Sequence, residues 1–176
     1  MRQVFKMSRV IILPLLMGAC ASTMSVSSHV DRGTDFARYR TYAWGPADAL
    51  PTGDPRLDGS PTFKDQLQGE VDRQLSLKGI TLASAGQPDV LIHYHAAASE
   101  RLDVSGLDQN YAYGGEVREY DAGTILIDVV DARTQRLIWR GWAQGALTDM
   151  LDDDEAMTRR LREAVRQMLA QLPLRP

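Results

Sequence analysis

Two histidines separated by one residue form the clearest chemical pattern in this sequence. His93 and His95 lie within residues 88–98, whose β-branched and aromatic composition predicts a strand. Residues two apart on a strand point to the same face of a sheet, so both imidazoles are suited to bind one zinc or copper ion. His29 is a candidate third ligand. The alternative is a structural role, with both histidines half-exposed and the alternating apolar residues of the strand facing the core.

A second group of residues combines aromatic rings with a positive charge. Trp139, Arg140 and Trp142 fall within one predicted strand, and such a group can hold a sugar or a peptide by stacking. The two tryptophans occupy opposite faces of a regular strand, so a shared site requires a bulge at Gly141. The alternative is that one tryptophan packs in the core while Arg140 pairs with Asp128 across a hairpin.

Tyrosines and glycines are concentrated in residues 105–123, between two predicted strands. Tyr111, Tyr113 and Tyr120 are the tyrosines of this segment. Tyrosine rings on a glycine-rich backbone provide contact area at a low cost in entropy, and long irregular connections are uncommon in compact domains unless they have a use. These three tyrosines are therefore predicted to form a binding site. The alternative is a hairpin end without a partner.

The sequence provides no recognisable catalytic motif. Acidic residues 149–155 lack the alternating spacing of a calcium-binding EF-hand loop, and negative charge at the start of a helix explains them. The chain has no Gly-x-Ser-x-Gly elbow, no glycine-rich phosphate loop and no His-Glu-x-x-His pair. No catalytic residue is assigned, and a non-enzymatic role is favoured over an enzymatic one.

The N-terminal residues predict export. Arg2, Lys6 and Arg9 precede an apolar run at residues 10–17, which is shorter than the ~20 residues of a membrane-spanning helix. Residues 1–19 are therefore interpreted as a cleaved signal peptide.

Cys20 is the single cysteine of the chain, and it follows the residues Leu-Met-Gly-Ala. This run resembles the bacterial lipobox, whose cysteine receives a diacylglyceryl group and an N-acyl chain. A lone thiol cannot form an internal disulfide, whereas several acyl chains anchor a protein stably. We expect this covalent lipid on Cys20 and no other cofactor. Because no aspartate follows the cysteine, sorting to the outer membrane is expected. The alternative to lipidation is ordinary signal-peptide cleavage, which leaves Cys20 as an incidental thiol.

The charge of the mature chain restricts its partners. Without residues 1–19, the chain carries 17 Lys and Arg against 23 Asp and Glu, a formal charge of −6. An acidic domain is repelled by phosphates and anionic head groups. Nucleic acid is therefore not an expected partner, and membrane contact should come from the lipid alone. Residues 20–25 form a tether of at most ~15–18 Å, which keeps the domain at the membrane surface.

Residues 26–173 are predicted to form a single α+β domain. Strands are expected at residues 25–30, 39–44, 88–98, 124–130 and 136–144, with a further short strand beginning at residues 80–82. Helices are expected at residues 62–78, capped by Thr62, and at residues 152–172. The order β-β-α-β-β-β-α predicts a mostly antiparallel sheet of about five to six strands with two helices packed on one face.

Four segments together resemble a known family. They are residues 35–44, 88–95, 123–128 and 137–143. Their residue types and spacing are similar to those of the bacterial lipoprotein family named domain of unknown function 4136, over roughly residues 24–173. The resemblance implies an exported, usually lipidated α+β domain of the Gram-negative envelope. It implies no activity and no catalytic residue.

These observations favour an outer-membrane lipoprotein that faces the periplasm and acts as a non-enzymatic interaction or envelope-maintenance module. An envelope protein is its candidate partner. Two alternatives remain open. One is a metal-dependent enzyme that uses His93 and His95, and the other is a carrier of a small apolar or sugar ligand bound beside Trp139 or Trp142.

Overall fold

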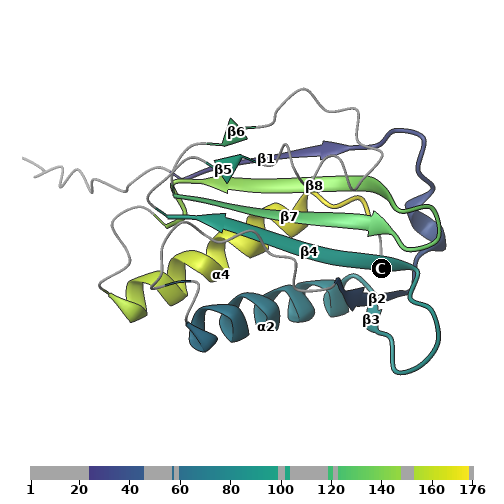
Figure 1. The fold of residues 1–176 in the computed structure, drawn as a ribbon, viewed down its shortest axis with the longest axis horizontal. Coiled ribbons are helices and arrows are strands. Elements are labelled where there is room, and N and C mark those ends of the chain that lie inside the picture. Colours follow the sequence, from purple (N-terminus) through teal and green to yellow (C-terminus); the bar gives the residue numbers. More distant parts are fainter. Residues whose placement is uncertain are drawn as a thin grey trace, which may run out of the picture.

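The computed structural model of the chain describes residues 24–45, 57, 60–98, 102–103, 119–120, 123–147 and 153–174. Within these ranges the chain forms one six-stranded sheet and two α-helices, which lie together on one side of the sheet (Figure 1). The sheet strands are β1 (Ser25–Val30), β2 (Thr41–Trp44), β3 (Thr81–Leu82), β4 (Val90–Ala97), β7 (Thr124–Asp131) and β8 (Arg136–Gln144). The helices are α2 (Pro61–Leu77) and α4 (Asp154–Ala170). The α+β class and the two helices are confirmed.

The sheet is mixed, so the prediction of a mostly antiparallel sheet is wrong. Its strand order is β1-β8-β7-β4-β2-β3. The pairs β1–β8, β8–β7 and β7–β4 are antiparallel, whereas β4–β2 and β2–β3 are parallel. Parallel neighbours need a long crossover connection, and α2 provides it between β2 and the strands that follow.

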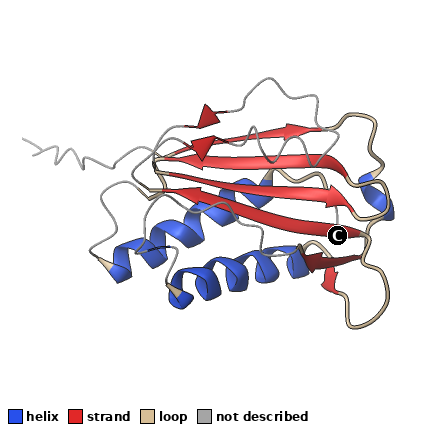
Figure 2. Ribbon diagram, in the orientation of Figure 1, coloured by secondary structure: helices blue, strands red, loops and turns tan. Residues whose placement is uncertain are grey.

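The order of elements also differs from the prediction. A one-turn 3-10 helix, η1 (Phe36–Arg38), separates β1 from β2. Two short strands, β5 (Leu102–Asp103) and β6 (Glu119–Tyr120), follow β4 and precede β7 in the sequence. They pair with each other as a separate two-stranded sheet (Figure 2). Strands of two residues carry no periodic pattern, and for this reason the sequence did not reveal them.

Both helices begin at side-chain caps. Ser60 caps α2, because its Oγ accepts a hydrogen bond of 3.2 Å from the backbone N–H of Phe63. The predicted cap, Thr62, lies inside the helix. Asp153 caps α4 through a 2.9 Å bond from the N–H of Ala156. These caps satisfy N–H groups that have no partner inside the helix.

The hydrophobic core lies between the sheet and the helices. Alternate strand residues, including Ile92, Ile127 and Trp139, face α2 and α4 and are almost fully buried. The apolar stripe of α2, from Phe63 to Leu75 at every fourth residue, faces the same core. No helix in the described part of the chain has the length and hydropathy needed to cross a membrane.

Candidate functional site

A row of four polar residues crosses the sheet on the face opposite the helices. The register pairs His29 of β1 with Arg140 of β8, Arg140 with Asp128 of β7, and Asp128 with His93 of β4. Neighbouring residues such as Trp139 point to the helices, so alternation directs this row away from them. The row therefore lies on the second face of the sheet.

The centre of this row is a buried ion pair. Arg140 Nε donates to Asp128 Oδ1 at 2.7 Å, and Arg140 Nη2 donates to Asp128 Oδ2 at 2.8 Å. Both side chains are 0% exposed. The predicted pairing across the hairpin is confirmed. Arg140 is thus committed to Asp128, and its use in ligand binding stays a prediction.

The two tryptophans of β8 lie on opposite faces, as their spacing predicted. Trp139 is fully buried in the core, whereas Trp142 is half-buried on the face of Arg140. The sheet does contain a bulge, but it lies between Val129 and Val130 and not at Gly141. Trp139 and Trp142 therefore do not share one site, and a binding role of Trp142 stays a prediction.

His93 and His95 share a sheet face, as expected for residues two apart on β4. His95 is only 3% exposed, and neither of its ring nitrogens has a hydrogen-bond partner among the described residues. Burial lowers the pKa of His95 to about 4; nearby Asp128 opposes this shift, whereas Arg140 and His93 reinforce it. His95 is therefore neutral at neutral pH, which is the form that binds metals.

The histidines do not form a three-ligand metal site within the described ranges. His29 is separated from His93 by β7 and β8, a distance of about 14 Å at the usual strand spacing. No group of three or more His, Cys, Asp or Glu side chains suited to a metal occurs in the part of the chain described. Metal binding by His93 and His95 alone stays a prediction.

Several predicted site residues lie outside the described structure. Cys20, Tyr111 and Tyr113 fall in ranges that are not described. Tyr120 is placed only by its backbone, which pairs with Leu102 between β6 and β5. The roles predicted for these residues therefore stay predictions.

Asp131, at the end of β7, joins the β7–β8 turn to η1. Its Oδ1 accepts bonds from the N–H groups of Arg133 and Thr134 and from Thr134 Oγ1, at 2.7–3.1 Å. Its Oδ2 accepts from Arg38 Nη2 and, at 2.8 Å, from the Tyr39 hydroxyl. Burial alone would raise the pKa of Asp131, but these hydrogen bonds outweigh burial and lower it to about 2.

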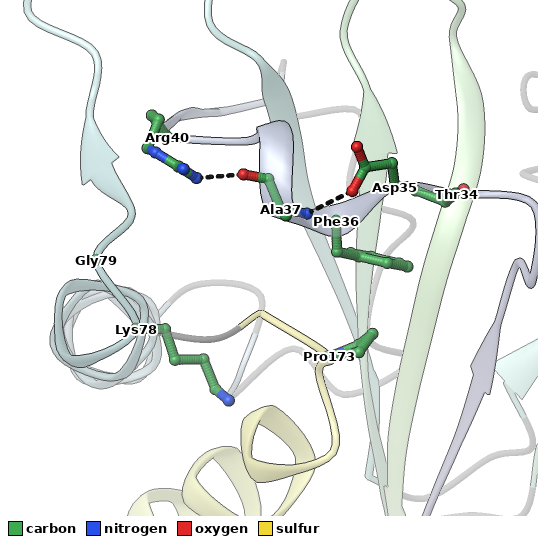
Figure 3. Close-up of a pocket in the computed structure, with 8 residues that line it drawn as sticks. All are labelled: Thr34, Asp35, Phe36, Ala37, Arg40, Lys78, Gly79 and Pro173. Atoms are coloured by element: carbon green, nitrogen blue, oxygen red, sulfur yellow. Dashed lines mark hydrogen bonds between the residues drawn. The ribbon is translucent and has the colours of Figure 1, made fainter.

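A cavity of about 660 Å³ lies beside η1, where α2 and α4 end (Figure 3). Its lining includes Phe36, Ala37, Arg40, Lys78, Gly79 and Pro173. Hydrogen bonds hold the η1 side in place: Asp35 Oδ1 accepts from the N–H of Ala37 at 3.1 Å, and Arg40 Nη1 donates to the Ala37 carbonyl at 2.6 Å. The volume falls in the usual range of small-molecule sites, which is about 300–1,000 Å³.

Lys78 gives this cavity a partly desolvated positive charge. Its Nζ donates to the carbonyl oxygen of Leu172 at 3.0 Å and to that of Leu174 at 3.5 Å, which ties the end of α2 to the chain after α4. Burial lowers the pKa of Lys78. A lysine with this perturbation in a cavity is a candidate ligand-binding group.

No motif in the sequence indicates this cavity. Its lining comes from residues 34–37, 40, 78–79 and 173, which only the folded chain brings together. One local signal was available: Gly79 follows the predicted helix and adopts a φ of 76°, a conformation typical of helix C-termini. That signal locates the helix end but not the cavity.

The fold and its topology define an α+β domain with a mixed sheet covered by two helices on one face. A protein family described as domain of unknown function (DUF4136) matches residues 26–174. The chain belongs to this family, as its sequence motifs predicted. The comparison with curated proteins gave no match.

Two solved structures have a similar fold. A DUF4136 family protein from Bacteroides thetaiotaomicron has a TM-score of 0.59 and 18% identity, over 86% of this chain and 96% of that chain. A PDZ domain protein from Parabacteroides distasonis has a TM-score of 0.51 and 18% identity, over 87% of this chain and 37% of that chain. At these identities the likeness concerns the fold alone.

Proposed function

We propose that this DUF4136 protein is an outer-membrane lipoprotein that faces the periplasm, is anchored through lipid on Cys20, and acts as a non-enzymatic interaction module. The observation that carries this proposal is the position of β1. The strand begins at Ser25, five residues after Cys20 in the sequence, so the anchor and the start of the domain are close. A lipid on Cys20 would hold this end of the domain at the membrane.

The direction of β1 supports a binding role for the other end. β1 is a six-residue strand, which spans about 20 Å. The chain then forms η1, whose residues line the cavity (Figure 1). The cavity therefore lies at the end of the sheet remote from the start of β1. An anchored domain with this orientation presents the cavity to the periplasm.

Anchoring is tested by labelling cells with a palmitate analogue and separating their membranes. The proposal expects labelled protein in the outer-membrane fraction, and unlabelled, released protein for Cys20→Ser. An Ala21→Asp variant is the matched control, because it keeps the cysteine while placing an aspartate after it, and it should move to the inner membrane. A Cys20→Ser protein that remains in the outer membrane would overturn the proposed anchor.

The interaction role is tested by crosslinking the lipidated protein in cells and identifying its partners by mass spectrometry. The control variant carries a Gly/Ser sequence in place of residues 107–120, which removes Tyr111, Tyr113 and Tyr120. An envelope protein that is lost with this variant would support an interaction module and locate its contact. The absence of a specific partner from both strains would contradict the interaction role.

A second candidate function is metal binding at His93 and His95, favoured by one observation. His95 is buried with no hydrogen-bond partner for either nitrogen among the described residues, which is costly unless a ligand occupies the site. Protein purified without chelators should then contain stoichiometric metal, which the double variant His93→Ala/His95→Ala loses and His29→Ala retains. Metal-free wild-type protein would exclude this function.

A further inference from the structure

Two cationic side chains line the cavity beside η1. Arg40 and Lys78 line it from different elements, and neither forms an ion pair with a described carboxylate. Arg40 Nη1 donates to the carbonyl oxygens of Ala37 and Tyr39, and its Nε and Nη2 have no bond to a described residue. Lys78 Nζ uses two carbonyl acceptors and has a third N–H group to offer.

The negative end of helix α2 does not cancel this charge. The last carbonyl oxygens of α2 already have partners: Leu75 O accepts from the N–H groups of Lys78 and Ile80, and Ser76 O accepts from that of Gly79. After α4, the carbonyl oxygens of Leu172 and Leu174 are bonded by Lys78 itself. The two cations and the carboxylate of Asp35 leave a net positive charge in the lining.

The same cavity has an apolar side. Phe36 is only 8% exposed, and its ring lies between the η1 backbone and Pro173 (Figure 3). Ala37 and the methylene groups of Lys78 add apolar surface to the lining. Burial of apolar groups contributes most of the affinity for small ligands, while a few polar groups fix their orientation.

We propose that this cavity binds a small organic acid, whose anionic head is attracted by Lys78 and Arg40 while its apolar body packs against Phe36 and Pro173. The assignment rests on the proposed function in one respect. It names the ligand for the end of the domain remote from Cys20, where the proposed function places binding. The partial burial of Lys78, which lowers its pKa, supports the assignment. An anion bound there would favour the charged form of Lys78 and raise that pKa.

The test is a titration of the isotope-labelled, lipidated protein in phosphatidylcholine nanodiscs with 3-phenylpropionate, followed by NMR. The backbone amides of Ala37 and Gly79 and the side chain of Lys78 report on the cavity. We expect saturable shifts of these signals and an upward shift of the Lys78 pKa. The uncharged 3-phenylpropanamide has the same apolar body, and its affinity should be lower by about tenfold or more. If the acid only partitions into the lipid, the signals of Ala37, Gly79 and Lys78 will not change. That result would overturn the proposal.

Variants separate the head-group contacts from general effects on folding. Lys78→Gln should weaken binding of the acid about tenfold, whereas Lys78→Arg keeps the charge and should retain most of the affinity. Arg40→Gln should also weaken binding. Arg32→Gln is the matched control, because Arg32 is exposed, lies outside the cavity lining and should not affect binding. Equal affinity for acid and amide, or unchanged affinity in Lys78→Gln, would overturn the proposal. Either result would leave the membrane anchor intact, so the two failures are distinguishable.

Discussion

Arg140 and Asp128 are directly opposite each other on β8 and β7 and are joined by two hydrogen bonds with both side chains fully buried. Removing two charges from water costs several kcal/mol per ion, and only a well-formed pair offsets that cost. The pair fixes the polar character of the second sheet face between His93 and His29. Each of the two buried charges is therefore stabilised by the other, and the pair has a structural role.

Breaking this pair should destabilise the fold more than replacing it. Arg140→Met leaves Asp128 charged and buried, and we expect a loss of about 3–5 kcal/mol in the free energy of unfolding. The double variant Arg140→Met/Asp128→Leu removes both charges and should recover most of this loss. Urea unfolding of Arg140→Met, Asp128→Leu and the double variant measures the coupling energy between the two residues. Additive losses would show that the two residues act independently.

His95 should make the protein sensitive to mild acid. Its pKa is about 4 in the folded state and about 6.5 when unfolded. Between these values only the unfolded chain takes up the proton, so the stabilisation present above pH 6.5 is lost as the pH falls towards 4. The loss should reach about 3 kcal/mol.

The variant His95→Leu checks this prediction by urea unfolding at pH 7.5, 5.5 and 4.5. Its stability should fall less than that of the wild type across this range. His29→Ala serves as the control, since His29 is exposed on the same face of the sheet. An equal fall in all three proteins would show that His95 is not the responsible group.

Asp131 should act at lower pH and in the same direction. Its pKa is about 2 in the folded protein and about 3.9 in the unfolded chain. A lowered carboxyl pKa stabilises the fold above the unfolded value, and this stabilisation is lost as the pH falls from about 5 to 2. The contribution is about 2–3 kcal/mol. Asp131→Asn should be less stable than the wild type at pH 6, and this difference should shrink towards pH 2. Thermal unfolding across this pH range measures the difference. A difference that does not depend on pH would contradict the assignment.

Gly141 should tolerate no larger side chain because of the ring above it. A Cβ at this position would lie 2.2 Å from Cη2 of Trp139, which is 0% exposed and has no space to move. Gly141→Ala should cost about 1–3 kcal/mol of unfolding free energy. Gly69→Ala is the matched control, because Gly69 is an exposed helical residue with nothing near its Cβ position, and it should stabilise α2 by about 0.5–1 kcal/mol. Denaturant unfolding of the two variants decides the point; equal effects would contradict this packing.

Features with a local cause could be predicted from the sequence. The helix containing Phe63 and Leu75 follows from a four-residue apolar repeat, and the acidic start of α4 agrees with its Asp153 cap. The antiparallel pairing of β7 and β8 follows from the short turn between them. The parallel pairs of β2 could not be predicted, because they depend on where the chain returns after α2.

The candidate sites show the same division. The shared face of His93 and His95 follows from strand alternation, and the pairing of Arg140 with Asp128 follows from hairpin register. The cavity was missed because Arg40 and Lys78 are far apart in the sequence and have no motif in common. Burial of His95 could not be foreseen either, since the helix-free face of a sheet is usually exposed to solvent.

The most direct test of the lipid anchor is intact-mass spectrometry of the protein isolated from outer membranes. The account predicts a chain that begins at Cys20 and carries the mass of a diacylglyceryl group and an N-acyl chain. Base treatment should release the ester-linked chains, while the amide-linked chain remains. A chain that begins at Cys20 or Ala21 without acyl groups, or one that retains residues 1–19, would contradict the anchor on which the proposed function depends.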